Sequence, residues 1–172
     1  MALVPAGAKR TRVDKTGRVS AGILPWRRRD GRVEVLLGHP GGPFFARKDE
    51  GHWTVIKGEI VPGEDPVAEA RREFAEETGL APPDGPLTEL GQIRQKSGKV
   101  VLAWAVEGDV DAAASVSNTF EMEWPPRSGR IQAFPEIDRV AWFDPPEARR
   151  RIKAAQAPFL DRLEASLCSD PA

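Results

Sequence analysis

The strongest folding signal in this chain is a central segment that holds both a helix start and a helix stop. Asp65 can cap free backbone N–H groups, and Pro66 loses no hydrogen bond at the first helical position because proline lacks a backbone N–H. Gly79 suits the residue just past a helix end, and the Ala-Pro-Pro run at 81–83 prevents the helix from continuing. The pattern predicts a helix over Pro66–Thr78.

The predicted helix has an apolar side next to an acidic one. At about 100° per residue, the first side carries Val67, Ala70, Phe74 and Thr78, and a neighbouring arc carries Glu69, Glu73, Glu76 and Glu77. Glutamates three or four positions apart repel one another, and Arg72 lies only at the edge of the arc. Two interpretations fit this pattern: a solvated charged face, or a set of carboxylates that binds a divalent cation.

The wider segment adds further residues at fixed spacings. In chain order these are Gly58, Glu64, Arg72, Glu73, Phe74, Glu76, Glu77, Gly79 and Leu80. At ordinary residue frequencies such a match arises on the order of once in 10⁹ starting positions. The spacing resembles the signature of the Nudix hydrolase family, and this resemblance favours the metal-binding interpretation of the helix.

The resemblance also implies an architecture. Nudix proteins are α/β/α sandwiches of the α/β (α+β) class, with a mixed, partly antiparallel sheet, and the order of segments here is similar over about residues 18–167. Strands are expected at 19–28, 31–40, 53–58, 87–95, 99–108 and 139–145, and one or two closing helices within 146–167. The first two strands should form an antiparallel hairpin across the turn at 29–31. The stretch 109–135 is expected to be irregular.

The same resemblance implies roles for residues of the signature. Glu73, Glu76 and Glu77 are the implied metal ligands, joined by a backbone carbonyl of Lys57 or Gly58, and Mg²⁺ is the implied ion, with Mn²⁺ as the alternative. Arg72 holds a catalytic glutamate in place. Glu64 braces the loop against the helix, Gly58 permits a close backbone approach, and Gly79 ends the helix.

The implied reaction is hydrolysis at phosphorus in a pyrophosphate linkage, where metal ions neutralise phosphate oxygens and orient a water. Glu73 or Glu76 would accept the proton from that water. Family members often add a carboxylate from a downstream segment, and Glu121 or Glu123 would supply it here; the alternative is that both are exposed loop acids.

Substrate residues are expected on both sides of the metal site. Arg47, Lys48, His52 and Lys57 can meet phosphate oxygens, or can simply be solvated in a loop. Phe45 with its neighbour Phe44, or Trp124, can stack on a nucleobase, or can belong to a packed cluster. The leading segments resemble Nudix enzymes for nucleoside triphosphates or dinucleoside polyphosphates. The chain departs from the latter because it contains no tyrosine for the base.

Length and composition bound the remaining possibilities. A chain of 172 residues suits a single domain, expected over 18–172, preceded by a flexible basic tail at 1–17 rather than a nucleic-acid-binding arm. Because 25 basic residues nearly balance 26 acidic ones, neither a stable nucleic-acid partner nor a membrane surface is expected. The lone cysteine, Cys168, suits the cytoplasm.

Two other functions stay open at this point. A Nudix-fold nucleotide sensor would bind without cleaving, although such modules usually lose signature acids that are intact here. An RNA 5′-end pyrophosphohydrolase would need few phosphate contacts. The exact nucleotide, the bond that is cleaved, and the choice between a monomer and a homodimer do not follow from the residues.

Overall fold

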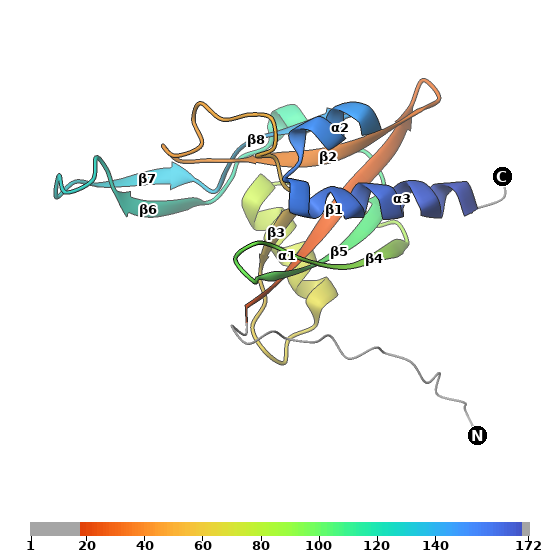
Figure 1. Cartoon of the computed structure of the whole chain (residues 1–172), viewed down its shortest axis with the longest axis horizontal. Helices are drawn as coiled ribbons and strands as arrows, with labels where there is room; N and C mark the ends of the chain where they lie inside the picture. Colours follow the sequence, from red (N-terminus) through yellow and green to blue (C-terminus); the bar gives the residue numbers. More distant parts are fainter. Residues whose placement is uncertain (1–17, 170–172) are drawn as a thin grey trace.

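The computed structural model describes residues 18–169 (Figure 1). The predicted tail at 1–17 therefore lies outside the described residues. A six-stranded mixed sheet forms the centre, in the order β4-β5-β1-β2-β8, with β3 paired to β1. Its strands are β1 (Val19–Arg29), β2 (Arg32–Pro40), β3 (Ile56–Glu59), β4 (Leu87–Arg94), β5 (Val100–Glu107) and β8 (Ile137–Phe143). The predicted α/β class with a mixed sheet is confirmed.

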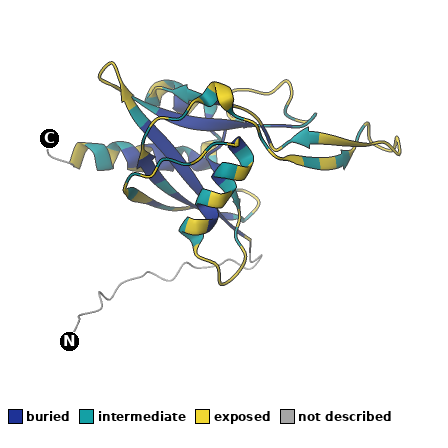
Figure 2. Cartoon of the chain, turned by 180° about the vertical axis from the view of Figure 1, so that it is seen from behind, coloured by how far each residue is buried: buried dark blue, intermediate teal, exposed yellow. Residues whose placement is uncertain are grey.

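Strand β1 is the axis of the sheet. It runs parallel to β5 and antiparallel to both β2 and β3. The predicted β1–β2 hairpin is confirmed, and its turn places Asp30 and Gly31 at positive φ, 50° and 74°. Figure 2 shows β1 buried along most of its length, because helices cover both faces of the sheet.

The helices divide between the two faces. Helix α1 (Pro66–Thr78) packs on one face through Ala70 and Phe74, both fully buried against Ala21 and Ile23 of β1. Helices α2 (Pro145–Arg151) and α3 (Ala157–Ser169) cover the other face, and these two are the predicted closing helices. Short 3₁₀ turns stand at Ala112–Ala114 and Ala154–Gln156. The arrangement is a sandwich of three layers.

Helix α1 has the predicted bounds and the predicted caps. The Asp65 carboxylate accepts a hydrogen bond from the Val67 N–H, and Gly79 takes the left-handed conformation at φ 67°. The Gly79 N–H then donates to the Ala75 carbonyl, which closes the last turn. These local signals fix where the helix starts and ends.

The expectation of an irregular stretch at 109–135 is wrong. It contains a two-stranded antiparallel ribbon, β6 (Thr119–Glu123) and β7 (Ile131–Pro135), which projects from the main body in Figure 1. Its signal was present in the sequence: Phe120, Met122 and Trp124 alternate with polar residues at the strand period. The predicted strand at 53–58 is also shorter than expected, because Trp53 and Thr54 make only single bridges.

Within residues 18–169 there is no helix with the length and apolar character needed to span a membrane.

Candidate active site

Helix α1 lies so close to β3 that only glycine fits at position 58. A Cβ atom built on Gly58 would sit 1.9 Å from the Glu73 carboxyl carbon. The Glu73 carboxyl group therefore packs directly on the β3 backbone, and its burial raises its pKa, although the nearby Arg72 charge opposes the rise. The close backbone approach predicted for Gly58 is present.

Arg72 joins three of the helix glutamates. Its guanidinium donates to Glu69 at 2.6 Å, to Glu73 at 2.9 Å and to Glu76 at 2.8 Å. Hydrogen bonds to Glu69 and Glu76 raise the pKa of Arg72, so it stays charged. The sequence pattern placed Arg72 at the edge of an all-acidic arc, whereas the folded side chain reaches across that arc and offsets its repulsion.

Glu77 faces β3 and is the most perturbed acid of the helix. Its carboxyl group accepts a hydrogen bond from the Lys57 backbone N–H. Burial raises the pKa of Glu77 to about 8; the Lys57 charge lowers it, and the charges of Glu73 and Glu136 raise it further. A carboxyl that is costly to ionise alone is well suited to ionise against a bound cation.

Glu136 is a residue that the sequence reasoning missed. It lies between β7 and β8, close enough to Glu77 for its charge to act on that carboxyl. Backbone hydrogen bonds hold it there: its N–H donates to Asn118, whose own N–H donates to the Glu76 carbonyl at the end of α1. No sequence signal marks this position, because the contact depends on the path of the chain between β5 and β8.

The two acids predicted for the downstream role lie on the ribbon instead. Glu121 is exposed in β6 opposite Ala133, and Glu123 accepts a hydrogen bond of 2.7 Å from the Gly129 N–H in the ribbon turn. Their proposed metal role stays a prediction. Glu64 shares a hydrogen bond with Glu69, which raises the pKa of Glu64 and links the loop before α1 to the helix.

The donor groups of this site suit a hard divalent cation. Glu73, Glu76 and Glu77 offer carboxylate oxygens next to the β3 backbone, which is the chemistry that Mg²⁺ prefers. Within residues 18–169 no group of three acids, histidines or cysteines is arranged to hold a metal ion, and Arg72 pairs with Glu73 and Glu76. A cation would therefore share these carboxylates with Arg72.

On the opposite face of the sheet, three lysines gather around β3 and form what we call the lysine cluster: Lys57, Lys99 and Lys153. The Lys57 side chain lies on this face because the adjacent Gly58 position faces Glu73 of α1 and strand residues alternate between faces. The Cβ position of its partner Gly22, 2.8 Å from the Lys57 Cβ, shares that face. Burial and the charges of Lys153 and Lys99 lower the pKa of Lys57 to about 8. Burial and Lys99 likewise lower the pKa of Lys153.

Two buried polar groups lie on residues next to the lysine cluster, together with one acid. Ser20 is two residues from Gly22 on the same face, and Gln95 donates its backbone N–H to the Lys99 carbonyl. The Ser20 hydroxyl and the Gln95 amide nitrogen are buried without a hydrogen-bond partner among the described residues. Glu59 is the facing acid, and it already pairs with Arg18 and with Lys99 at 3.1 Å. The cluster therefore carries a surplus of positive charge and unused donors.

All of the other predicted substrate residues except Trp124 lie in the loop 41–55 between β2 and β3. Phe45 contacts the His52 ring with centroids 6.3 Å apart, and the Lys48 ammonium lies 5.6 Å from the centre of the Phe45 ring. Phe44, which is 58% exposed, meets Trp124 of the ribbon edge to face at 5.4 Å. Arg47 is exposed in the same loop. The fold thus brings Lys48, His52 and Phe45 together. It also places Trp124 against Phe44.

A three-layer sandwich with a glutamate-bearing helix packed on one face of the sheet defines a class of protein, and comparison with known families identifies this class. A model described as the NUDIX domain matches residues 16–163. The chain belongs to this family. Nudix enzymes generally use divalent metal ions.

The chain is similar to individual known proteins in sequence and in structure. The chain is 38% identical over 61 residues to the asymmetrical bis(5′-nucleosyl)-tetraphosphatase of Rattus norvegicus, and the match spans 33% of this chain and 42% of the rat protein. Among solved structures it is similar to a C. elegans Ap4A hydrolase binary complex, with a TM-score of 0.62, 23% identity, and 89% and 99% of the two chains covered. The chain is also similar to the NUDIX domain of Shewanella oneidensis NrtR complexed with ADP ribose, with a TM-score of 0.60, 16% identity, and 87% of each chain covered. These structures support the fold.

Proposed function

We propose that this protein is a Mg²⁺-dependent pyrophosphohydrolase of nucleotides that carry an extended phosphate chain, with dinucleoside polyphosphates or nucleoside triphosphates preferred over ADP-ribose and nucleotide sugars. One observation carries the proposal: at Lys57 the acidic face of α1 and the lysine cluster meet across a single short strand. Glu77 bonds the Lys57 backbone, and the Lys57 ammonium belongs to the cluster. Carboxylates that can bind a metal ion thus lie next to lysines that can bind phosphates.

On the α1 side, Glu73, Glu76 and Glu77 would hold the cation, together with a backbone carbonyl of Lys57 or Gly58. The bound cation would supply charge neutralisation and acidify a water. Glu73 or Glu76 would take the proton from that water. Arg72 would keep these two carboxylates oriented through its bonds of 2.9 and 2.8 Å. Glu136 is a third candidate for the proton acceptor, because its charge acts on Glu77.

On the opposite side, the lysine cluster would bind the phosphates that are not cleaved. Three cations with neighbouring unpaired polar groups suit a chain of several phosphates better than a chain of only two phosphates. Each added phosphate brings further negative charge and further acceptor oxygens. Lys48 and His52 in the loop 41–55 would extend the same surface. The rat tetraphosphatase acts on a substrate of this class, which supports the choice.

The nucleobase would stack on the aromatic residues that border the loop. Phe45 and Trp124 replace the tyrosines that this chain lacks, and the exposed Phe44 ring is the most accessible face. We expect the enzyme to work in the cytoplasm, where the free and exposed Cys168 stays reduced.

A substrate panel tests the proposal. It compares nucleoside triphosphates, dinucleoside polyphosphates, ADP-ribose, nucleotide sugars and 5′-triphosphate RNA with Mg²⁺ or with a chelator. We expect the highest kcat/KM for a dinucleoside polyphosphate or triphosphate, and no turnover with the chelator. Glu77→Gln should lower kcat at least about a hundredfold, while Glu89→Gln, an exposed acid of β4, should match the wild type. Full turnover in Glu77→Gln or with the chelator contradicts the mechanism.

The panel also separates the mechanism from the substrate. If ADP-ribose or a nucleotide sugar gives the highest kcat/KM, the substrate choice is wrong but the glutamate mechanism stands. If RNA does, the enzyme is a 5′-end pyrophosphohydrolase. Binding of a nucleotide without any turnover would identify a sensor.

A further inference from the structure

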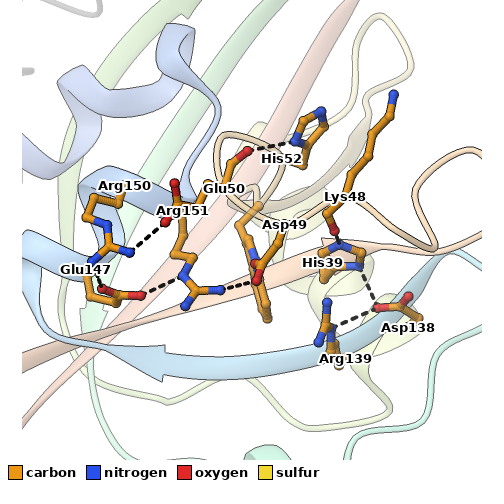
Figure 3. Close-up of polar contacts among 11 residues, drawn as sticks. His39, Lys48, Asp49, Glu50, His52, Asp138, Arg139, Glu147, Arg150 and Arg151 are labelled. Carbon is orange, nitrogen blue, oxygen red and sulfur yellow. Dashed lines mark hydrogen bonds and ion pairs between the residues drawn. The ribbon is translucent and has the colours of Figure 1, made fainter.

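A buried histidine links the sheet to the loop 41–55. His39, near the end of β2, is fully buried. Its Nδ1 lies 2.8 Å from the Asp138 carboxylate of β8, and its Nε2 lies 2.6 Å from the Lys48 carbonyl (Figure 3). The Trp53 ring packs against it at 5.2 Å. The loop is therefore hydrogen-bonded to the core at Lys48.

Both neighbours of the imidazole are hydrogen-bond acceptors. A carboxylate and a carbonyl can each accept but not donate, so the His39–Asp138 pair must hold two protons between its members for both bonds to form. In either arrangement of these protons, Nε2 carries the one that it donates to Lys48. Asp138 thus fixes the orientation of the ring and keeps Nε2 a donor.

The rest of the loop is held mainly from α2. Asp49 accepts from the Trp53 indole at 2.6 Å and pairs with Arg151, while Glu50 pairs with Arg150 at 2.6 Å. The Glu50–Arg150 pair is 60% exposed on both sides, so solvent screens it. The His39 bond is shielded from water and acts on the residue that carries a predicted phosphate-binding side chain.

We propose that His39, oriented by Asp138, is a positioning residue that fixes the loop 41–55 so that Lys48 and its neighbours face the substrate. The inference rests on the proposed function, because it assigns the loop to phosphate binding. With the Lys48 carbonyl held by His39, the Lys48 ammonium stays over the Phe45 ring, next to His52. His39 does not touch substrate, and its effect is on binding rather than on the cleavage step.

The test combines kinetics with amide hydrogen exchange in the full chain. His39→Leu removes both bonds. Asp138→Asn is the conservative variant: its amide can donate to Nδ1, so a neutral ring keeps the Nε2 proton and the bond to Lys48. Leu163→Ala, a buried residue of α3, is the matched control for lost stability away from the loop.

We expect His39→Leu to speed amide exchange in residues 41–52, to raise KM for the preferred nucleotide about tenfold, and to change kcat by less than about twofold. Asp138→Asn should stay near the wild type in loop exchange, in KM and in kcat. Leu163→Ala should lower Tm without either loop effect. Unchanged loop exchange in His39→Leu, or an equal change in Leu163→Ala, overturns the inference.

Two further results separate this inference from the proposed function. Faster loop exchange in His39→Leu with an unchanged KM would also overturn the positioning role, because the loop would then not serve the substrate. A wild type inactive toward the whole panel would refute the proposed function and the substrate role of the loop, while the exchange data would still decide whether His39 holds the loop.

Discussion

The two sides of β3 carry opposite charge and are assembled in different ways. On the side of α1, the glutamates that contact β3 or pair with Arg72 within the described residues come from one helix, mostly at spacings of three or four residues. On the other side, the lysines come from three segments: Lys57 from β3, Lys99 from the residue before β5, and Lys153 from the second residue after α2. One strand thus separates a site built locally from a site built by the fold.

This difference explains what each side needs to function. The helix positions its glutamates through its own geometry, and β3 adds the close approach at Gly58 and the Lys57 backbone N–H that donates to Glu77. The lysines are positioned only if β1, β3 and β5 pair in register and the chain after α2 returns to Trp53, where the Lys153 N–H donates to the Trp53 carbonyl at 2.8 Å. Damage to packing should therefore affect phosphate binding before it affects the metal site.

The largest expected effect comes from filling the space between α1 and β3. Gly58→Ala places a methyl group where the Glu73 carboxyl group stands, so that carboxyl must move and kcat should fall about a hundredfold. A double-mutant cycle of kcat checks the cause. Because both changes act on one carboxyl, Gly58→Ala combined with Glu73→Ala should be no slower than Glu73→Ala alone. Additive losses would show that alanine at 58 disturbs something other than Glu73.

An intermediate effect is expected on the lysine side. Lys57→Met and Lys99→Met keep the length of the side chain and remove its charge, so KM for the polyphosphate substrate should rise about tenfold with kcat little changed. Raised salt should weaken wild-type binding more than variant binding. Lys96→Met, an exposed lysine in the turn before β5, is the control and should match the wild type. A fall in kcat without a rise in KM would place Lys57 or Lys99 in the cleavage step instead.

The smallest expected effect is on thermal stability as a function of pH, measured with and without Mg²⁺. Because the pKa of Glu77 rises from 4.5 to about 8 on folding, the folded chain holds a proton that the unfolded chain has lost, and stability falls as pH rises between these values. Mg²⁺ must displace that proton, so its effect on Tm should be larger at about pH 8.5 than at about pH 6.5. Thermal scans of wild type and Glu77→Gln measure this. An equal Mg²⁺ effect in the variant would place the cation elsewhere.

The sequence by itself determined the helix and the class of chemistry. Asp65, Pro66 and Gly79 act on the backbone within one turn of where they stand, so both ends of α1 were predictable. The spacing of the glutamates from Glu69 to Glu77 likewise needs only helix geometry. The β1–β2 hairpin follows from a turn of two residues at positive φ.

Only the tertiary structure decided which distant side chains meet. Arg72 bridges three glutamates through its rotamer, Glu136 reaches Glu77 through the path of the chain after β7, and Lys57 points away from α1 because strand residues alternate between faces. The role of His39 depends on Asp138 and Lys48, 99 and nine residues away. Such contacts carry no local pattern, because they form between segments that only the packed sheet brings together.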